Sequence, residues 1–182
     1  MSTETTPEKT TTLYRAPPWV TNPVDAASAA IERMGPGDRA SLRRLRPEQL
    51  HEPAFWKLTT TTLNAHLPTT PAARDAAEQR WAMVLPVLAD AIHVPGRRLG
   101  TALAEAGVSE GRLIRLLRAQ GEALEGVVRA VAHQLASAGA PFDHADLAWL
   151  VLTEGRDDAE KARHQVARDY YYAVGKDQSP TT

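Results

Sequence analysis

Arginines gather near the beginning of the chain, in the sequence GPGDRASLRRLRP. They are Arg39, Arg43, Arg44 and Arg46. A guanidinium group is planar and can donate two parallel hydrogen bonds to one phosphate or carboxylate. At about 100° per residue, a helix would place Arg39, Arg43 and Arg46 on one face, with Arg44 pointing elsewhere. We therefore expect a phosphate-binding face here. The alternative, that these arginines pair with acids from another helix, stays equally open.

A second set of arginines follows in the sequence SEGRLIRLLRAQ. Arg112, Arg115 and Arg118 recur at every third position, with leucines between them, and Arg98 lies upstream. Two basic helix faces in the two halves of one chain suit a long polyanion better than a small phosphate. Contacts to phosphates release counterions, so such binding falls steeply with salt. Neither set has the Asn or Gln in its first turns that would read adenine, which favours contact with the backbone.

These arginines depend on helices for their positions, and helical patterns cover most of the sequence. The expected helices are 23–34, 38–46 with Asp38 as N-cap, 71–90, 99–107, 109–120 capped by Ser109, 121–138 with Gly139 as its stop, one beginning near 141, and 157–172 with a capping box of Asp157 and Glu160. Broken turns are expected across 47–63. Leu42 and Leu45 should point into the core, away from the arginine face.

The fold class that follows is all-α, as two small helical bundles packed together. The expected division is an N-terminal bundle over 19–96 and a C-terminal bundle over 97–176. The Thr- and Pro-rich residues 1–18 and the end of the chain, 177–182, are expected to be disordered tails.

Composition narrows the function classes. The 182 residues include no cysteine, which excludes disulfides, thiolate metal ligands and cysteine nucleophiles. No stretch approaches the roughly 20 apolar residues of a membrane span, and the N-terminus lacks the apolar segment of a signal peptide. We expect a cytoplasmic protein without a membrane partner. The formal net charge of −1 does not argue against polyanion binding, because one surface can be basic while the rest is acidic.

Sequence signatures of small-molecule enzymes are missing. We find no phosphate-binding loop, no dinucleotide-binding glycine pattern, no nucleophile elbow and no zinc-binding H-E-x-x-H. Asp143, His144 and Asp146 are interpreted as a helix beginning with acids rather than as a metal site. Neither a cofactor nor a metal is expected. The tyrosines 170–172 could stack bases, but we expect them to fill a groove between helices with one ring outside, and we expect the four tryptophans to pack in the core.

Residues 99–120 also fit a helix-turn-helix, with Gly107 at the turn. Leu103 departs from that motif, which usually has a small residue there. In a transcription regulator, the segment 111–119 would enter the major groove. This segment carries arginines but has no Asn or Gln in its first turns, which favours contact with the phosphate backbone over reading of the bases.

The order of these pieces resembles the CasB family, the small subunits of the type I-E CRISPR effector complex Cascade. The resemblance rests on GDRASLRRLRPEQLHEPAFWKL, on RRLGTALAEAGVSEGRLIRLLRA and on a last helix with RHQVARDYYY, and it covers about residues 25–175. It implies two helical bundles without catalytic activity. Two copies would lie beside the backbone subunits and the large subunit of Cascade, near guide RNA and target DNA.

The resemblance also implies which residues contact nucleic acid. Arg43 and Arg44 match the LRR pair of the family, and Arg112, Arg115 and Arg118 match its second basic helix. Arg39, Arg46 and Arg98 are further candidates. The implied role is to hold the target strand and the displaced strand of the R-loop. Two alternatives stay open: a helix-turn-helix DNA-binding regulator, and a purely structural scaffold subunit.

Overall fold

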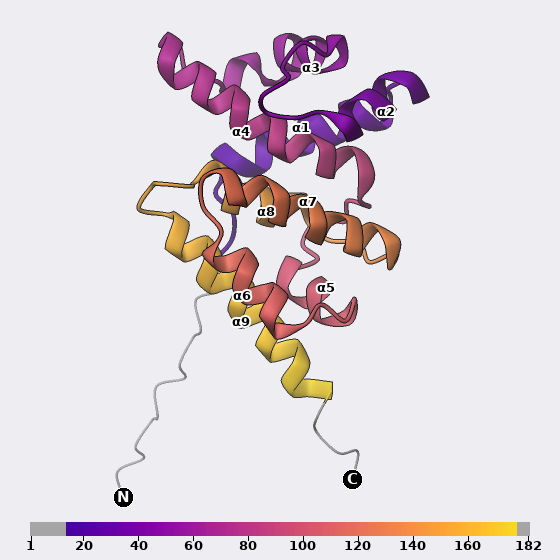
Figure 1. Cartoon of the computed structure of the whole chain (residues 1–182), viewed down its shortest axis with the longest axis vertical. Coiled ribbons are helices and arrows are strands. Elements are labelled where there is room, and N and C mark those ends of the chain that lie inside the picture. The colour runs from indigo at the N-terminus through magenta and orange to yellow at the C-terminus, as the bar shows by residue number, and fades with distance from the viewer. Residues whose placement is uncertain (1–13, 178–182) are drawn as a thin grey trace, which may run out of the picture.

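The computed structural model describes residues 14–177 as a series of helices (Figure 1). The elements are α1 (Pro18–Glu32), α2 (Pro36–Arg44), α3 (Pro53–Leu58), the π-helical turn η1 (Thr59–Leu63), the 3-10 turn η2 (Asn64–His66), α4 (Pro71–Asp90), α5 (Leu99–Glu105), α6 (Glu110–Arg118), α7 (Glu122–Ser137), α8 (His144–Leu152) and α9 (Ala159–Asp177). Within these residues, β pairing is limited to one isolated bridge between His93 and Phe142. The predicted all-α class is confirmed.

Prolines begin the first four helices. Pro18, Pro36, Pro53 and Pro71 each stand in the first turn, where a backbone N–H has no helical partner to lose. Two predicted starts are therefore wrong. The first helix begins at Pro18 instead of Pro23, and the second has Gly35 instead of Asp38 at its N-cap.

Burial explains why α1 continues through Pro23. Val20, Val24, Ala27 and Ile31 recur at helical spacing and are all buried, so the apolar stripe spans the proline.

The predicted bounds are correct for α4, and the expected stop of α7 is confirmed at Gly139, which has φ 60°. The last helix, α9, begins at Ala159 and extends beyond Tyr172 to Asp177, so its predicted bounds were too early at both ends.

Helix α8 lies at the centre of the molecule. All nine of its residues are buried, with α1, α4 and α9 packed around it and α7 running beside α4 (Figure 1). The buried apolar residues from α1 to α9 form one continuous cluster, so both halves of the chain share a core. The division into bundles at residues 96 and 97 stays a prediction.

The expected tails lie mostly outside the described residues. Within the described part, Ala16 is buried, the Tyr14 carbonyl accepts a hydrogen bond from Arg98, and α1 begins at Pro18. None of the helices between residues 14 and 177 combines the length and hydrophobicity that a membrane-spanning segment requires.

Helix α5 has only seven residues, but it packs closely along α9. Gly100 makes this approach possible. A Cβ atom at this position would lie 2.7 Å from both Asp169 Cβ and Tyr170 N, and closer still to the carbonyl of Val166. Two of these neighbours are backbone atoms of α9, which cannot move aside as a flexible side chain could.

Gly100→Ala is therefore expected to lower the free energy of unfolding by roughly 1–3 kcal/mol, because the added methyl group must push α5 away from α9. Urea unfolding followed by circular dichroism measures the change. Gly111→Ala is the matched control: nothing lies within 4 Å of its added Cβ. Alanine favours a helix over glycine by up to about 1 kcal/mol. Equal stability of the two variants would contradict the packing argument.

Candidate nucleic-acid interface

Two arginines of α2 cap the end of α4. The Nε atoms of Arg39 and Arg43 each donate to the carbonyl oxygen of Ala89 at 3.0 Å, and Arg43 Nε lies 3.6 Å from the Asp90 carboxylate. Cations at a helix C-terminus satisfy its free carbonyls and oppose its dipole. No further side-chain bond of Arg39 or Arg43 occurs within residues 14–177, so both keep their Nη donors available.

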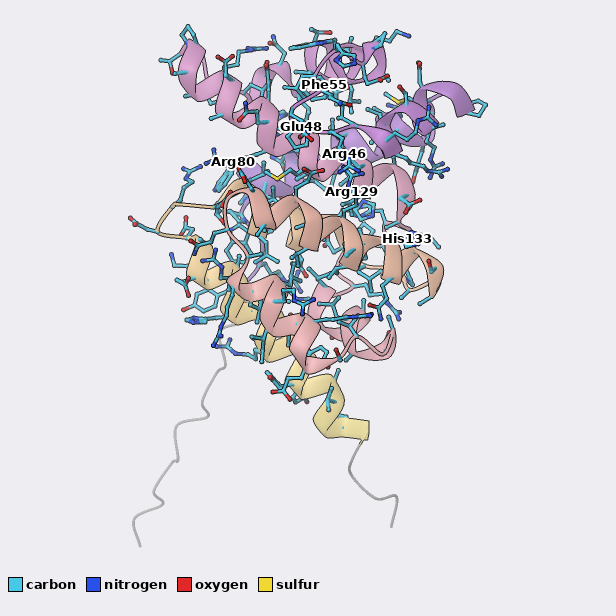
Figure 2. All side chains as sticks on the ribbon, in the orientation of Figure 1. Arg46, Glu48, Phe55, Arg80, Arg129 and His133 are labelled. Atoms are coloured by element: carbon cyan, nitrogen blue, oxygen red, sulfur yellow. The ribbon has the colours of Figure 1, made fainter. Side chains whose placement is uncertain are left out.

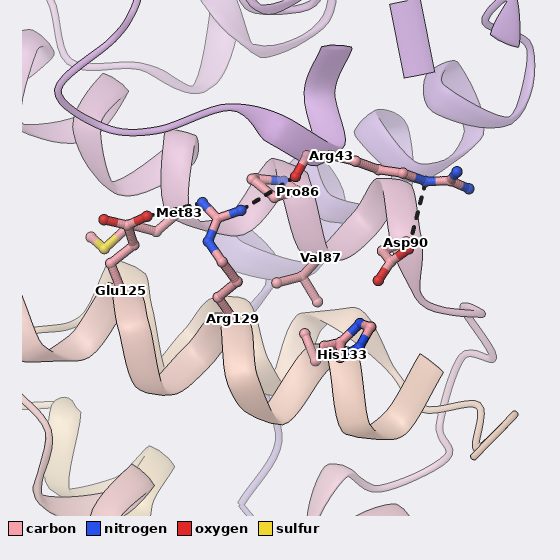
Figure 3. Close-up of a pocket in the computed structure, with 9 residues that line it drawn as sticks. Arg43, Met83, Pro86, Val87, Asp90, Glu125, Arg129 and His133 are labelled. Carbon is pink, nitrogen blue, oxygen red and sulfur yellow. Dashed lines mark hydrogen bonds and ion pairs between the residues drawn. The ribbon is translucent and has the colours of Figure 1, made fainter. Parts of the chain in front are cut away.

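An arginine of α7 caps the end of α2 in the same way. Arg129 Nη2 donates to the Leu45 carbonyl at 2.7 Å and to Glu125 at 2.9 Å, and its Nη1 reaches the Arg43 carbonyl at 3.3 Å (Figure 3). Arg46 Nη1 also lies 3.2 Å from Glu125. These bonds fix the end of α2 against α4 and α7. Pairing with acids of other helices, which the sequence left open, is therefore present at Asp90 and Glu125.

A groove lies beneath Arg43, between α4 and α7. Its volume is about 260 Å³, with Arg129 and His133 on the α7 side and Met83 and Val87 on the α4 side (Figure 3). Asp90 and Glu125 also line it and balance its arginines. The groove is thus mixed in charge.

Arg44 differs from its neighbours on α2. It is exposed, and within residues 14–177 it has no hydrogen bond or ion pair. Leu42 and Leu45 are buried, as predicted from the helical spacing. Arg44 is therefore the α2 arginine with all its donors available to a ligand.

The α6 arginines form the exposed stripe that the sequence predicted. Arg112, Arg115 and Arg118 are all exposed, while Leu113 and Leu116 are buried beneath them. Arg112 Nη1 donates to the side-chain oxygen of Gln134 on α7 at 2.6 Å. Arg115 and Arg118 have no internal hydrogen bond or ion pair in the described part of the chain. Their part in nucleic-acid binding stays a prediction.

Helix α7 separates the two arginine sets. Its Glu125 and Arg129 bind residues of α2, and its Gln134 binds Arg112 of α6 on the other side. Figure 1 shows α2 and α6 on opposite sides of α7, and Figure 2 shows Arg46, Arg129 and His133 along the α7 region. Between the sets, α7 exposes the small residues Gly126 and Ala130.

Sequence reasoning did not include Arg129, Glu125 and His133 in this region. Arg129 and Glu125 show the i, i+4 spacing of a helical ion pair, which is the one signal available. Their contacts with Arg43 and Arg46 join residues about 80 positions apart, and no local pattern specifies such a pairing.

Arg98 is bound inside the protein through all three of its nitrogen atoms. They donate to Asp169 at 2.9 Å, to Asp146 at 2.8 Å and to the Tyr14 carbonyl at 3.0 Å. Asp146 also accepts from the Leu99 N–H at 3.0 Å. Burial raises the pKa of Asp146 to about 6, although the Arg98 charge and the Leu99 bond act in the opposite direction. Arg98 therefore joins the N-terminal segment, α8 and α9.

The cluster Asp143, His144 and Asp146 begins α8, as the sequence indicated. Asp143 is the N-cap and accepts from the Ala145 N–H at 3.0 Å. Burial, and secondarily the nearby charge of His93, lower the pKa of His144 to about 3. The two imidazole rings lie 4.6 Å apart, and His144 Nδ1 lies 3.3 Å from the Ser28 hydroxyl. Its Nε2 is buried without a hydrogen-bond partner within residues 14–177.

The expected burial of the aromatic residues is only partly confirmed. Trp81, Trp149 and Tyr170 are buried. The prediction is wrong for Trp19 and Trp56, which are exposed, and the rings of both Tyr171 and Tyr172 lie outside, where one exposed ring was expected. Adjacent residues on a helix point about 100° apart, so three consecutive tyrosines cannot all face the same core.

The fold and this surface together define an all-α protein that presents arginines from two helices on either side of a third. The family model for CRISPR-associated protein Cse2 matches residues 38–171. The chain therefore belongs to this family, which is the CasB family that the sequence resembled. Its membership makes the chain a Cascade subunit.

A solved structure agrees with this assignment. The chain is similar to one in the crystal structure of E. coli Cascade bound to a PAM-containing dsDNA target with a 32-nt spacer. The two share 25% sequence identity with a TM-score of 0.63, over 84% of this chain and 96% of that chain. None of the curated proteins matches the sequence.

His144 is expected to make stability depend on pH. Its pKa is about 3 in the folded protein against 6.5 for the free side chain, so its contribution is present above pH 6.5 and lost as pH falls. Asp146 acts oppositely: its raised pKa favours the folded state at low pH, and this contribution is lost as pH rises through about 6. Between about pH 6.5 and 6, His144 loses its contribution while Asp146 does not yet offset the loss, so stability should fall there.

The test compares wild type with His144→Asn by urea unfolding at several pH values. The difference in unfolding free energy between them should shrink by roughly 1.4 kcal/mol per pH unit below 6.5. His51→Asn, which replaces an exposed histidine, is the control. Parallel curves for wild type and His144→Asn would show that His144 is not the titrating group.

Proposed function

We propose that this protein is a non-catalytic subunit that holds nucleic-acid strands in a type I-E Cascade complex by their phosphate backbone. It would bind without sequence preference and stabilise the target strand and the displaced strand of the R-loop. The observation that carries the proposal is the set of arginine donors left available on α2 and α6. Arg44, Arg115 and Arg118 have no internal partners within residues 14–177.

The geometry of the capping arginines supports backbone contact. Arg39 and Arg43 are fixed by their Nε atoms, which restricts the guanidinium planes while leaving the Nη atoms for a ligand. A fixed planar fork loses less conformational entropy when it binds a phosphate. Phosphate contacts position a strand but carry no sequence information, which suits a subunit that must accept any target.

The energetics of strand exchange explain why such a subunit is useful. A guide RNA–DNA duplex is about as stable as the DNA duplex that it replaces, so protein contacts to the backbone can decide the balance. Arginines on both sides of α7 would supply this contribution. Arg98 is not among the proposed ligands, because all three of its nitrogens are bound internally.

The proposed partners are the backbone and large subunits of Cascade, a second copy of this chain, guide RNA and target DNA. Family membership supports an assembly of this kind. The similar chain belongs to a Cascade structure that contains a dsDNA target, and we extend that partnership to this protein as part of the proposal.

Charge reversal at Arg44, Arg115 and Arg118 should weaken DNA binding without unfolding the protein. The triple variant Arg44→Glu/Arg115→Glu/Arg118→Glu is expected to reduce the slope of log Kd against log salt by roughly one for each phosphate that the protein no longer neutralises. Fluorescence anisotropy with single-stranded and duplex DNA of unrelated sequences measures it. Lys57→Gln is the control, because it removes an exposed cation from α3.

The same variant distinguishes the alternatives in a reconstituted complex. We expect it to co-purify with the other subunits and to form R-loops that dissociate at lower salt than wild type. Loss of co-purification itself would support the scaffold subunit. Tight binding of wild type to one sequence would support the helix-turn-helix regulator, although α5 packs chiefly along α9. DNA binding and R-loops unchanged by the variant would overturn the proposal.

A further inference from the structure

Exposed aromatic rings lie on α9, in the segment before α1 and in the first turn of α1. Eight large apolar or aromatic side chains are exposed in the described part of the chain, and these rings are four of them. They are Tyr14, Trp19, Tyr171 and Tyr172, with 41%, 42%, 47% and 67% of their surface exposed. A contiguous exposed apolar patch is typical of a binding surface, and Tyr171 and Tyr172 are consecutive on α9.

Three of these rings have a cation beside them. Arg156 lies 4.9 Å from the centre of the Trp19 ring, Arg168 lies 6.0 Å from that of Tyr14, and Lys176 lies 4.7 Å from that of Tyr172. Within residues 14–177, no ion pair joins Arg156, Arg168 or Lys176 to a carboxylate. The surface therefore combines aromatic faces with positive charges that no acid neutralises.

The helical spacing places the strongest part of this surface in one row. Arg168, Tyr172 and Lys176 follow one another at i, i+4 and i+8, which spans about 12 Å along α9. Tyr171 lies next to this row, and its hydroxyl donates to Glu110 at 2.7 Å. Tyr170 points the other way, because it is buried and its hydroxyl donates to the Val108 carbonyl at 2.6 Å.

We propose that Arg168, Tyr171, Tyr172 and Lys176 form a stacking platform for unpaired bases of a single nucleic-acid strand. Every base has a π face, so stacking on tyrosine tolerates any sequence, while the two cations meet the phosphates. A duplex hides the faces of its bases within the stack and would gain only the charge contacts. The α9 platform, as we call these four residues, thus selects single strands.

The platform lies beside the α6 arginines, so the inference rests on the proposed function and extends it. The Tyr171–Glu110 bond ties α9 to the first residue of α6. Further along, a groove of about 320 Å³ between the two helices is lined by Arg118 of α6 and by Glu160, Arg163 and His164 of α9, where Glu160 pairs with Arg163. A strand held at Arg118 could therefore continue onto α9. This continuity, together with the unpaired cations, favours nucleic acid over a protein partner.

The experiment removes the rings and keeps the charges. Tyr171→Leu/Tyr172→Leu is compared with Tyr171→Phe/Tyr172→Phe in the full chain, by anisotropy on two fluorescent strands of roughly 20 nucleotides. One strand is oligothymidine, and the other is abasic with the same backbone charge. The leucine variant should bind oligothymidine on the order of tenfold more weakly, with abasic binding unchanged. The phenylalanine variant should bind both strands as wild type does.

Other outcomes would overturn the platform. Equal affinity of wild type for the two strands would show that bases do not stack, and so would a leucine variant that binds oligothymidine as wild type does. Unchanged DNA binding with loss of co-purification in the reconstituted complex would identify a protein interface instead. The triple arginine variant separates this test from the proposed function, because it should lose affinity for both strands equally.

Discussion

The interaction on which the rest of the structure depends is the ion pair between Arg98 and Asp146. Buried charges are costly unless hydrogen bonds satisfy them. Here all three Arg98 nitrogens donate hydrogen bonds, and Asp146 also accepts one from the Leu99 N–H. The pair connects the beginning of α5 with α8 and α9. The close contact of α5 with α9 follows from it, since Gly100 lies two residues after Arg98. The α6 arginines in turn take their positions from the turn that follows α5.

Three arginines around α2 stabilise the ends of helices. Arg39 and Arg43 use Nε for the end of α4, and Arg129 uses its Nη atoms for the end of α2. An exposed ion pair alone contributes little stability, but a cation that satisfies free helix carbonyls also fixes the orientation of its own side chain. Because these bonds are made within the protein, Arg39 and Arg43 are oriented before any ligand binds. Arg44, Arg115 and Arg118 add charge without such constraints.

The spacing of residues along the sequence predicted many of the helices and the exposure of the α6 arginines. Apolar spacing indicated the bounds of α4, the burial of Leu42 and Leu45, and the exposed stripe on α6, because these depend on residues within a few turns of one helix. The starts of α1 and α2 were missed, because first-turn prolines determine them and the acidic cap signal was weighed more heavily. The bonds of Arg43 with Ala89 and Arg129 join distant segments, and periodicity carries no information about such partners. That two of the tyrosine rings point outward instead of one was missed because the burial of a ring depends on which helix covers it.

The net charge of −1 conceals these surfaces because the acids are placed unevenly. Asp146 and Asp169 are bound to Arg98, Glu78 is buried against Arg74, and Glu125 lies between Arg46 and Arg129. Each of these carboxylates neutralises a cation that already has a structural task. The arginines left without acids include Arg39 and Arg44 of α2 and the three arginines of α6, and two more lie beside aromatic rings, Arg156 just before α9 and Arg168 within it. The field of those unpaired cations extends over a distance of about a Debye length. Within that distance, the fields of the paired charges cancel one another. The local pairing of acids, rather than the total charge, therefore sets which surfaces can attract a polyanion.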